Sequence, residues 1–169
     1  MGAAVNKLMV DPHDGLVSFQ QALGTGNLLV APVPSHHNLF SHVDFPAPGV
    51  SRLTYVRLSE DRRKVIAFVS CVLNGEIDGY RCIAVGYAVS QDERNKGHAK
   101  QVLREVVIDL VLQARMNGAE AIYIEAVVDV TNLPSQRVAE AILNMEREEF
   151  IDSNSGRPAY RYTARYECN

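Results

Sequence analysis

The sequence contains no tryptophan, and only three of its 169 residues are cysteines. Their number is odd and none stands in a Cys-x-x-Cys pair, which argues against a disulfide framework. Cys71 and Cys82 lie inside apolar stretches, where cysteine behaves as a small buried hydrophobe. Cysteine used in this way is typical of a reducing compartment, so we predict a cytoplasmic protein.

Long apolar runs and an excess of positive charge are also absent. No stretch approaches the ~18–20 apolar residues of a membrane span, and residues 1–10 lack the apolar region of a secretory signal. The formal net charge is -3, so no broad basic field is available to hold nucleic acid or an anionic membrane. We therefore expect neither a nucleic-acid partner nor a membrane partner.

Metal and nucleotide signatures are missing as well. His36, His37 and His42 lie close together without a matching cysteine or carboxylate, so a polar loop or short helix is favoured there over a metal site. We expect no metal. The patterns Gly-x-x-x-x-Gly-Lys and Gly-x-Gly-x-x-Gly do not occur, which argues against nucleotide-binding proteins of those classes.

The chain has enough apolar residues for a core. Its hydrophobic share is 47% and its charged share 22%, both ordinary for a globular domain. A length of 169 residues fits one domain. We predict a single domain over residues 1–169, with residues 1–52 as an N-terminal arm and residues 53–169 as the core of a sheet.

Hydrophobic periodicity predicts a mixture of helices and strands. One helix is expected over residues 14–23, irregular chain over 27–50, and a long amphipathic helix over 99–116, followed by a helix from about Pro134. Strands are expected at Leu53–Leu58, Lys64–Leu73, Tyr80–Val89, Ala121–Val128 and around Tyr160 to Tyr166. A parallel crossover through the long helix joins two of these strands and the rest pair antiparallel, so the class is α+β (mixed α/β).

The segment before the long helix combines the features of an anion site. A strand feeds a turn that contains Gly97, and the turn opens the helix. The first N–H groups of a helix lack intrahelical partners and lie at the positive end of its dipole. Gly97 allows the backbone to approach a phosphate closely. Arg94 and Lys96 add positive charge, while Asp92 and Glu93 can point to solvent.

Two motifs carry a resemblance to a known family. The segment Arg94-Asn95-Lys96-Gly97-His98-Ala99 resembles the acetyl-CoA loop of the GNAT acetyltransferase superfamily, Arg/Gln-x-x-Gly-x-Gly/Ala. Downstream, Asn132-Leu133-Pro134-Ser135 is similar to the family's Asn-x-x-Ser/Ala segment, in the form seen in members that acetylate protein N-termini. Together the two motifs cover about residues 80–145.

The resemblance implies a fold and a cofactor. It implies a GNAT-like, mostly antiparallel twisted sheet with one splayed parallel strand pair, flanked by about four helices, and acetyl-CoA as co-substrate. The backbone N–H groups near Tyr87 and Val89 would bind the thioester, and Asn132 and Ser135 would line the pantetheine arm, although helix capping is an alternative for both. The implied cofactor-binding residues are Tyr87, Ala88, Val89, Arg94, Asn95, Lys96, Gly97, His98, Ala99, Asn132 and Ser135.

The catalytic residues are less directly implied. Glu125 is the one carboxylate inside its strand, so it is a candidate base, with an outward-facing, solvated position as the alternative. Many family members carry a tyrosine as the acid at the position of Ala139. Tyr160 or Tyr162 on the last strand is a candidate substitute, with sheet packing favoured as the alternative for each.

The implied activity is acetyl transfer from acetyl-CoA to a primary amine of a small molecule or a peptide. Because the family tyrosine is absent at Ala139, a non-catalytic acyl-CoA-binding module stays open as the alternative. The acidic balance favours a cationic acceptor, and residues 1–52 should form much of the acceptor pocket. Edge strands and the tyrosine-rich last strand make a homodimer plausible.

Overall fold

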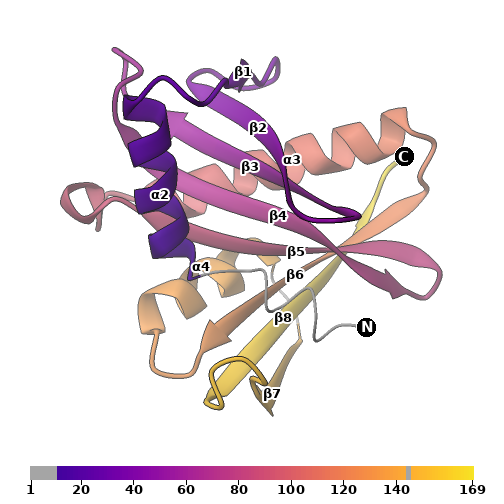
Figure 1. The fold of residues 1–169 in the computed structure, drawn as a ribbon. Helices are drawn as coiled ribbons and strands as arrows, with labels where there is room; N and C mark the ends of the chain where they lie inside the picture. The colour runs from indigo at the N-terminus through magenta and orange to yellow at the C-terminus, as the bar shows by residue number, and fades with distance from the viewer. Residues whose placement is uncertain (1–10, 144–145) are drawn as a thin grey trace.

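The computed structural model describes residues 11–143 and 146–169. Within these residues, eight strands form one sheet in the order β1-β2-β3-β4-β5-β6-β8-β7 (Figure 1). The strands are β1 (Ala31–Pro32), β2 (Leu39–Ala47), β3 (Val50–Leu58), β4 (Val65–Ile77), β5 (Tyr80–Val89), β6 (Ala121–Asp129), β7 (Arg147–Ile151) and β8 (Pro158–Glu167). The helices are α2 (Pro12–Gly24), α3 (His98–Met116) and α4 (Leu133–Leu143), with a 3₁₀ turn η1 (Gln91–Glu93) before α3.

Every neighbouring pair of strands is antiparallel except β5 and β6, which are parallel. This topology confirms the predicted mixed α/β class and the mostly antiparallel sheet. The described residues contain three α-helices rather than about four. None of these helices is long and apolar enough to cross a membrane.

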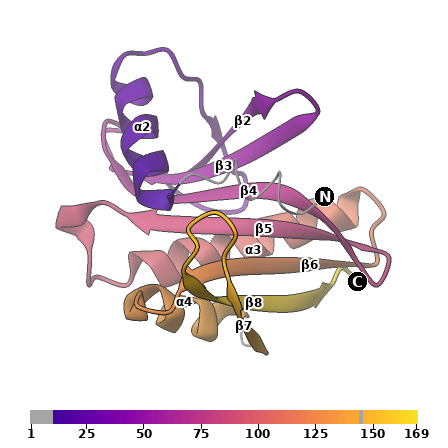
Figure 2. The ribbon, with the colours of Figure 1, turned by 60° about the horizontal axis from the view of Figure 1, so that its bottom comes forward.

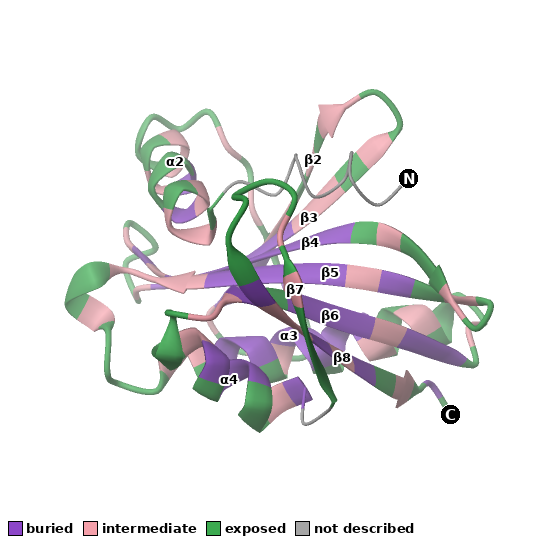
Figure 3. Cartoon of the chain, turned by 90° about the horizontal axis from the view of Figure 1, so that it is seen from below, coloured by how far each residue is buried: buried purple, intermediate pink, exposed green. Residues whose placement is uncertain are grey.

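The sheet is covered on both faces. Helix α2 lies on one face, while α3 and α4 lie on the other (Figure 2). The larger core fills the α3 side, where Val102, Leu103 and Val106 of α3 are fully buried against the central strands. Figure 3 shows buried residues along the middle strands and exposed residues on the outer sides of the helices. The apolar stripe along one side of α3 is therefore buried against the sheet, as its spacing predicts.

Helix α2 is held close to the sheet. Asp11 caps its N-terminus by accepting a hydrogen bond from the backbone N–H of His13 at 2.8 Å. Leu16 and Phe19 are buried in a second, smaller core. A Cβ added to Gly15 would lie 3.0 Å from the Phe68 ring of β4, so this helix approaches β4 more closely than a larger residue would allow.

The irregular chain expected over residues 27–50 is wrong, because β1 and β2 form there. Strand β2 is only half-buried along most of its length, so its side chains show no clean alternation. Its pairing with β3 fixes it instead, from Leu39 opposite Arg57 to Asp44 opposite Arg52. A cross-strand ion pair between Arg52 and Asp44 adds to that pairing.

The hairpin between β4 and β5 is confirmed, but its first strand is longer than expected. Strand β4 continues past Leu73 to Ile77, with a register irregularity at Asn74-Gly75. The turn itself is Asp78-Gly79, with φ values of 52° and 80°. Two positive φ values in a two-residue turn match the twist of the flanking strands, which is why an Asp-Gly pair suits this position.

The parallel pair β5–β6 separates after a short contact. Only Cys82, Ile83 and Ala84 of β5 pair with β6. Beyond them β5 stays paired with β4 as far as Val89, while β6 stays paired with β8 as far as Asp129. The C-terminal halves of the two strands therefore diverge, which confirms the expected splayed pair.

The packing of α3 yields a stability prediction. Leu103 of α3 is fully buried, whereas Leu112 on the same helix is 40% exposed. We expect Leu103→Ala to lower the free energy of unfolding by about 2–5 kcal/mol, because it leaves a cavity in the main core. Leu112→Ala, which removes the same atoms from the surface, should cost about 1 kcal/mol or less. Urea unfolding of both variants measures the difference, and similar losses would contradict the core assignment.

Candidate functional site

The gap between β5 and β6 exposes backbone N–H groups. The N–H of Ser90 donates to the carbonyl of Ile66 on β4 at 3.0 Å. Because hydrogen-bonding directions alternate along an antiparallel strand, the N–H of Ala88 also points toward β4, and those of Tyr87 and Val89 point the other way. They face the side where β6 has departed. The edge of β5 at Tyr87 and Val89, which the sequence resemblance predicts to bind a thioester, is therefore free of sheet pairing.

The N-terminus of α3 is the second set of free donors. Gly97 caps the helix with φ at 82° and without a side-chain cap. The first intrahelical bond runs from the N–H of Gln101 to the carbonyl of Gly97, at 3.2 Å. The N–H groups of residues 98–100 consequently have no intrahelical acceptor. Such a helix start favours a bound anion.

The Glu93 side chain of this loop does not point freely to solvent, as expected from the sequence, but is paired with two lysines. Glu93 accepts hydrogen bonds from Lys64 at 2.9 Å and from Lys96 at 3.0 Å. These two ammonium groups hold the pKa of Glu93 below its ordinary value. Lys96 is thereby paired with a carboxylate, so its charge is partly neutralised and the backbone of the loop contributes the clearer anion-binding feature.

Arg94 turns from the loop toward α2. Its Nε lies 3.5 Å from the carbonyl oxygen of Val89, and its Nη2 lies 3.5 Å from Nδ1 of His13. Both contacts are long for hydrogen bonds, so the guanidinium is held loosely. Arg94 therefore links the free end of β5 to the start of a helix on the opposite face of the sheet.

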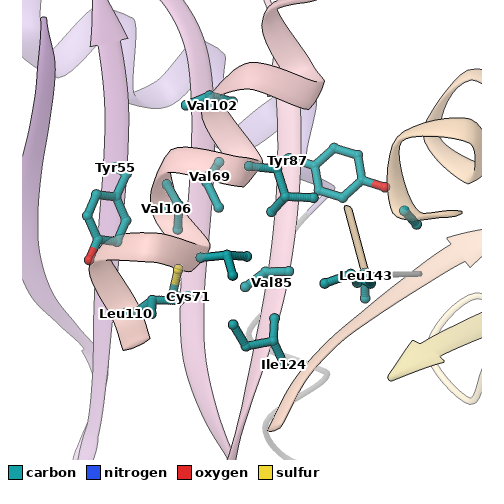
Figure 4. Close-up of a cluster of buried hydrophobic side chains, with 14 of the residues drawn as sticks. Tyr55, Val69, Cys71, Val85, Tyr87, Val102, Val106, Leu110, Ile124 and Leu143 are labelled. Atoms are coloured by element: carbon teal, nitrogen blue, oxygen red, sulfur yellow. The ribbon is translucent and has the colours of Figure 1, made fainter. Parts of the chain in front are cut away.

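The start of α4 forms the far wall. The side-chain oxygen of Asn132 accepts from the N–H of Ser135 at 3.2 Å, which is a helix-capping contact. The Tyr87 hydroxyl donates to the carbonyl of Ser135 at 2.6 Å, and Figure 4 shows its ring directed from β5 toward α4. Burial raises the pKa of the Tyr87 phenol above its ordinary value. This side chain fixes the distance between β5 and α4 where no strand pairing does so.

These elements enclose one cleft of about 710 Å³. All of the predicted cofactor-binding residues line it except Lys96. It is also lined by Asp11, Pro12 and His13 of α2, and by Lys100, Arg137 and Val138. Because α2 lies on one face of the sheet and α3 and α4 on the other, the cleft opens to both faces through the gap between β5 and β6.

The two predicted catalytic residues lie outside the lining of this cleft. Glu125 is buried on the face opposite α3, and it accepts a hydrogen bond from the Asn74 amide. Its carboxylate lies 3.9 Å from the Arg161 guanidinium. Burial, with Glu125 nearby, raises the pKa of the Cys82 thiol to about 12. The solvated, outward position considered for Glu125 is wrong, because polar partners surround it in the sheet.

Tyr160 packs within the sheet beside α4. Its ring lies 6.4 Å from that of Tyr162, and the Arg147 guanidinium sits 4.1 Å above it. The packing considered for Tyr160 is therefore present, and its role as an acid stays a prediction. Ala139, at the position of the family tyrosine, is completely buried.

Sequence reasoning missed the contribution of α2. Asp11, Pro12 and His13 precede the loop residue Arg94 by some eighty positions, and no local pattern connects them. Only the packing of α2 across β4 and β5 brings them to the cleft. The side chain of Tyr87 was missed as well, because the sequence motif concerned only its backbone.

A pair of matched glycine variants tests the loop. Gly97 and Gly118 flank α3 with φ values of 82° and 80°, and a Cβ at either would meet no atom within 4 Å. Valine should therefore strain both backbones to a similar extent. We expect Gly97→Val to weaken acetyl-CoA binding at least about tenfold, a loss of about 1.4 kcal/mol, because its side chain enters the cleft. Gly118→Val should leave binding unchanged in calorimetry, and equal effects would exclude the loop as the binding element.

Solved structures with a similar fold include three acetyltransferases. RimJ of Mycobacterium smegmatis, in complex with CoA-disulfide, aligns with a TM-score of 0.54 and 17% identity over 69% of this chain and 56% of that one. The ribosomal-protein-S5-alanine acetyltransferase of Vibrio fischeri gives 0.50 and 18% over 66% and 60%. RimL, a ribosomal L7/L12 alpha-N-protein acetyltransferase in complex with coenzyme A, gives 0.51 and 14% over 70% and 64%.

The chain thus spans less than two thirds of the length of these three proteins, and at such identities the likeness establishes the fold. A comparison with curated protein sequences finds no match. The profile of the acetyltransferase (GNAT) family matches residues 31–145, which include β2 to β6, the loop before α3, and the helices α3 and α4. The chain therefore belongs to the acetyltransferase (GNAT) family.

Proposed function

We propose that the protein transfers an acetyl group from acetyl-CoA to a primary amine of a small molecule or a peptide. The observation that carries this proposal is the cleft that opens through the sheet between β5 and β6. One side of it offers free N–H groups to a phosphate and a thioester, and the other side is open toward α2. A donor and an acceptor can therefore meet from opposite faces of the sheet.

The residues of the cleft fit coenzyme A. The N–H groups of residues 98–100 at the start of α3 would hold the pyrophosphate. The pantetheine arm would run along the free edge of β5, beside the Tyr87 side chain and the start of α4. The N–H of Val89 or Tyr87 would donate to the thioester carbonyl, and fixed donors of this kind stabilise the oxyanion of the transition state by a few kcal/mol.

The acceptor would approach from the α2 side. A lysine-like amine with a pKa near ~10.4 is neutral in only about one molecule in a thousand at pH 7.4, whereas an N-terminal amine near ~8 is far easier to use. RimL acts on ribosomal protein L7/L12 and the Vibrio fischeri enzyme on the alanine of ribosomal protein S5, which makes a peptide N-terminus a reasonable first acceptor. The net charge of -3 favours a cationic acceptor more generally.

Glu125 and Tyr160 stay candidates for the base and the acid. Glu125 lies outside the lining of the cleft, beside the Asn74 amide and the Arg161 guanidinium. We place the protein in the cytoplasm because its three cysteines are free and buried. A homodimer would use the sheet edges β1 or β7, since β8 lies between β6 and β7.

One observation favours a second function. Ala139, in the middle of α4, supplies no hydroxyl at the position where many family members carry a tyrosine. A protein that binds an acyl-CoA without turning it over would tolerate that loss. The competing function is therefore a non-catalytic acyl-CoA-binding module.

Calorimetry followed by a thiol assay separates the two functions. We expect acetyl-CoA to bind with one site per chain. Amine-dependent release of free CoA should then appear with spermidine, with a lysine peptide whose N-terminus is blocked, or with a peptide that begins with alanine. Binding without release for every amine would favour the module. Absence of binding would overturn both functions.

A further inference from the structure

We propose that His13, at the start of α2, is the general base that takes the proton from the acceptor amine. The inference rests on the proposed function and adds a catalytic residue to it. His13 was not among the residues that the sequence motifs singled out. It is the imidazole on the acceptor side of the cleft, where a proton must be removed.

The position of His13 is fixed by its backbone. Asp11 caps α2 by accepting the His13 N–H at 2.8 Å, and Pro12 occupies the first turn, where its fixed φ favours the helix. Gly15 seats this turn of the helix against the Phe68 ring of β4. The imidazole is therefore carried on a rigid element, and a substitution of its side chain leaves the cap intact.

The imidazole faces the free end of β5. Its Nδ1 lies 3.5 Å from Nη2 of Arg94, and Nε of the same guanidinium lies 3.5 Å from the Val89 carbonyl. A guanidinium has only N–H donors, so Nδ1 can meet it only as an acceptor. One guanidinium group thus separates a proton-accepting nitrogen from the residue whose N–H would polarise the thioester.

The charges around His13 come from several elements. Arg94 and Glu93 of the loop, Lys100 of α3 and Arg137 of α4 line the same cleft, together with Asp11 on its own helix and the neighbouring His98. Glu93 is bound to Lys64 and Lys96, so little of its negative charge is left for the imidazole. An imidazole ordinarily changes charge between pH 5 and 8, which suits a base that works near neutrality.

The proposed step is a proton transfer followed by an acyl transfer. The bound ammonium of the acceptor passes one proton to Nδ1 of His13, and the neutral nitrogen then forms a bond to the acetyl carbonyl carbon. The carbon–sulfur bond breaks, the leaving sulfur takes a proton of the attacking nitrogen through water, and His13 releases its own proton to solvent. An amine between His13 and β5 displaces the loosely held Arg94 guanidinium, which the pyrophosphate of the donor also attracts.

His13 fits this role better than the other candidate base. Glu125 does not line the cleft, and its carboxylate is already occupied by the Asn74 amide and faces Arg161. A base must come within hydrogen-bond reach of the proton that it takes. Glu125 would need its buried partners to rearrange before it could do so, whereas His13 lines the cleft and needs only the loosely held Arg94 guanidinium to move aside.

The pH profile of His13→Gln tests the proposal. In the wild-type protein, kcat/KM for an alanine-initiated peptide or for spermidine should rise with the ionisation of one enzyme group near neutral pH and then level off. In His13→Gln the profile should instead follow the neutral amine, rising tenfold per pH unit toward the amine pKa of about 8 or about 10.4. At pH 7 we expect kcat to fall by about a hundredfold, with the acetyl-CoA Kd unchanged in calorimetry.

Two control variants make the outcome decisive. His37→Gln removes an exposed imidazole that does not line the cleft, and it should keep the wild-type profile. Glu125→Gln should also keep the rise of kcat/KM near neutral pH. If Glu125→Gln lost that rise and His13→Gln kept it, the assignment of His13 as the base would be overturned while the acetyltransferase function would stand. A wild-type protein that binds acetyl-CoA but uses none of the amines would overturn the proposed function itself, and this inference with it.

Discussion

The divergence of β5 from β6 is the constraint on which the site depends. Three residues of β5, from Cys82 to Ala84, pair with β6, and the strands then follow β4 and β8 in different directions. A buried strand edge without hydrogen-bond partners is unfavourable. The free N–H groups of Tyr87 and Val89 are tolerated because they line a cleft, where water or a ligand can reach them. The sheet thus holds donors ready for a carbonyl oxygen without reorganisation.

Other contacts keep the gap open at a defined width. The Tyr87 hydroxyl bridges from β5 to the carbonyl of Ser135 on α4, in place of strand pairing. On the opposite face, α2 packs against β4 and β5 and carries His13 to the same opening. The residues that we propose for the donor and those that we propose for the acceptor therefore belong to separate layers of the fold.

Much of the fold was predictable because its signals are local. The bounds of β5 match the expected strand, and α3 begins one residue before the expected helix. The spacing of apolar residues in each of these two elements predicts its type without reference to the rest of the chain. The chain over residues 27–50 was mispredicted, because β2 is a half-buried strand near the sheet edge whose pairing with β3 decides its conformation. Neither Glu125 nor Tyr160 lies in the lining of the cleft. The sequence could not predict this, because alternation along a strand says which residues share a face but not what covers that face.

By itself the sequence determined the start of α3, where we propose that the donor binds. Strand, glycine turn and helix start are contiguous between Tyr80 and Met116, so the free N–H groups of the α3 N-terminus follow from local backbone geometry. Only the tertiary structure decided which residues of α2 face that helix start. His13 and Arg94 are far apart in the chain, and their 3.5 Å contact exists because α2 packs across the sheet. Contacts of that kind depend on which apolar faces bury one another, and no short motif encodes them.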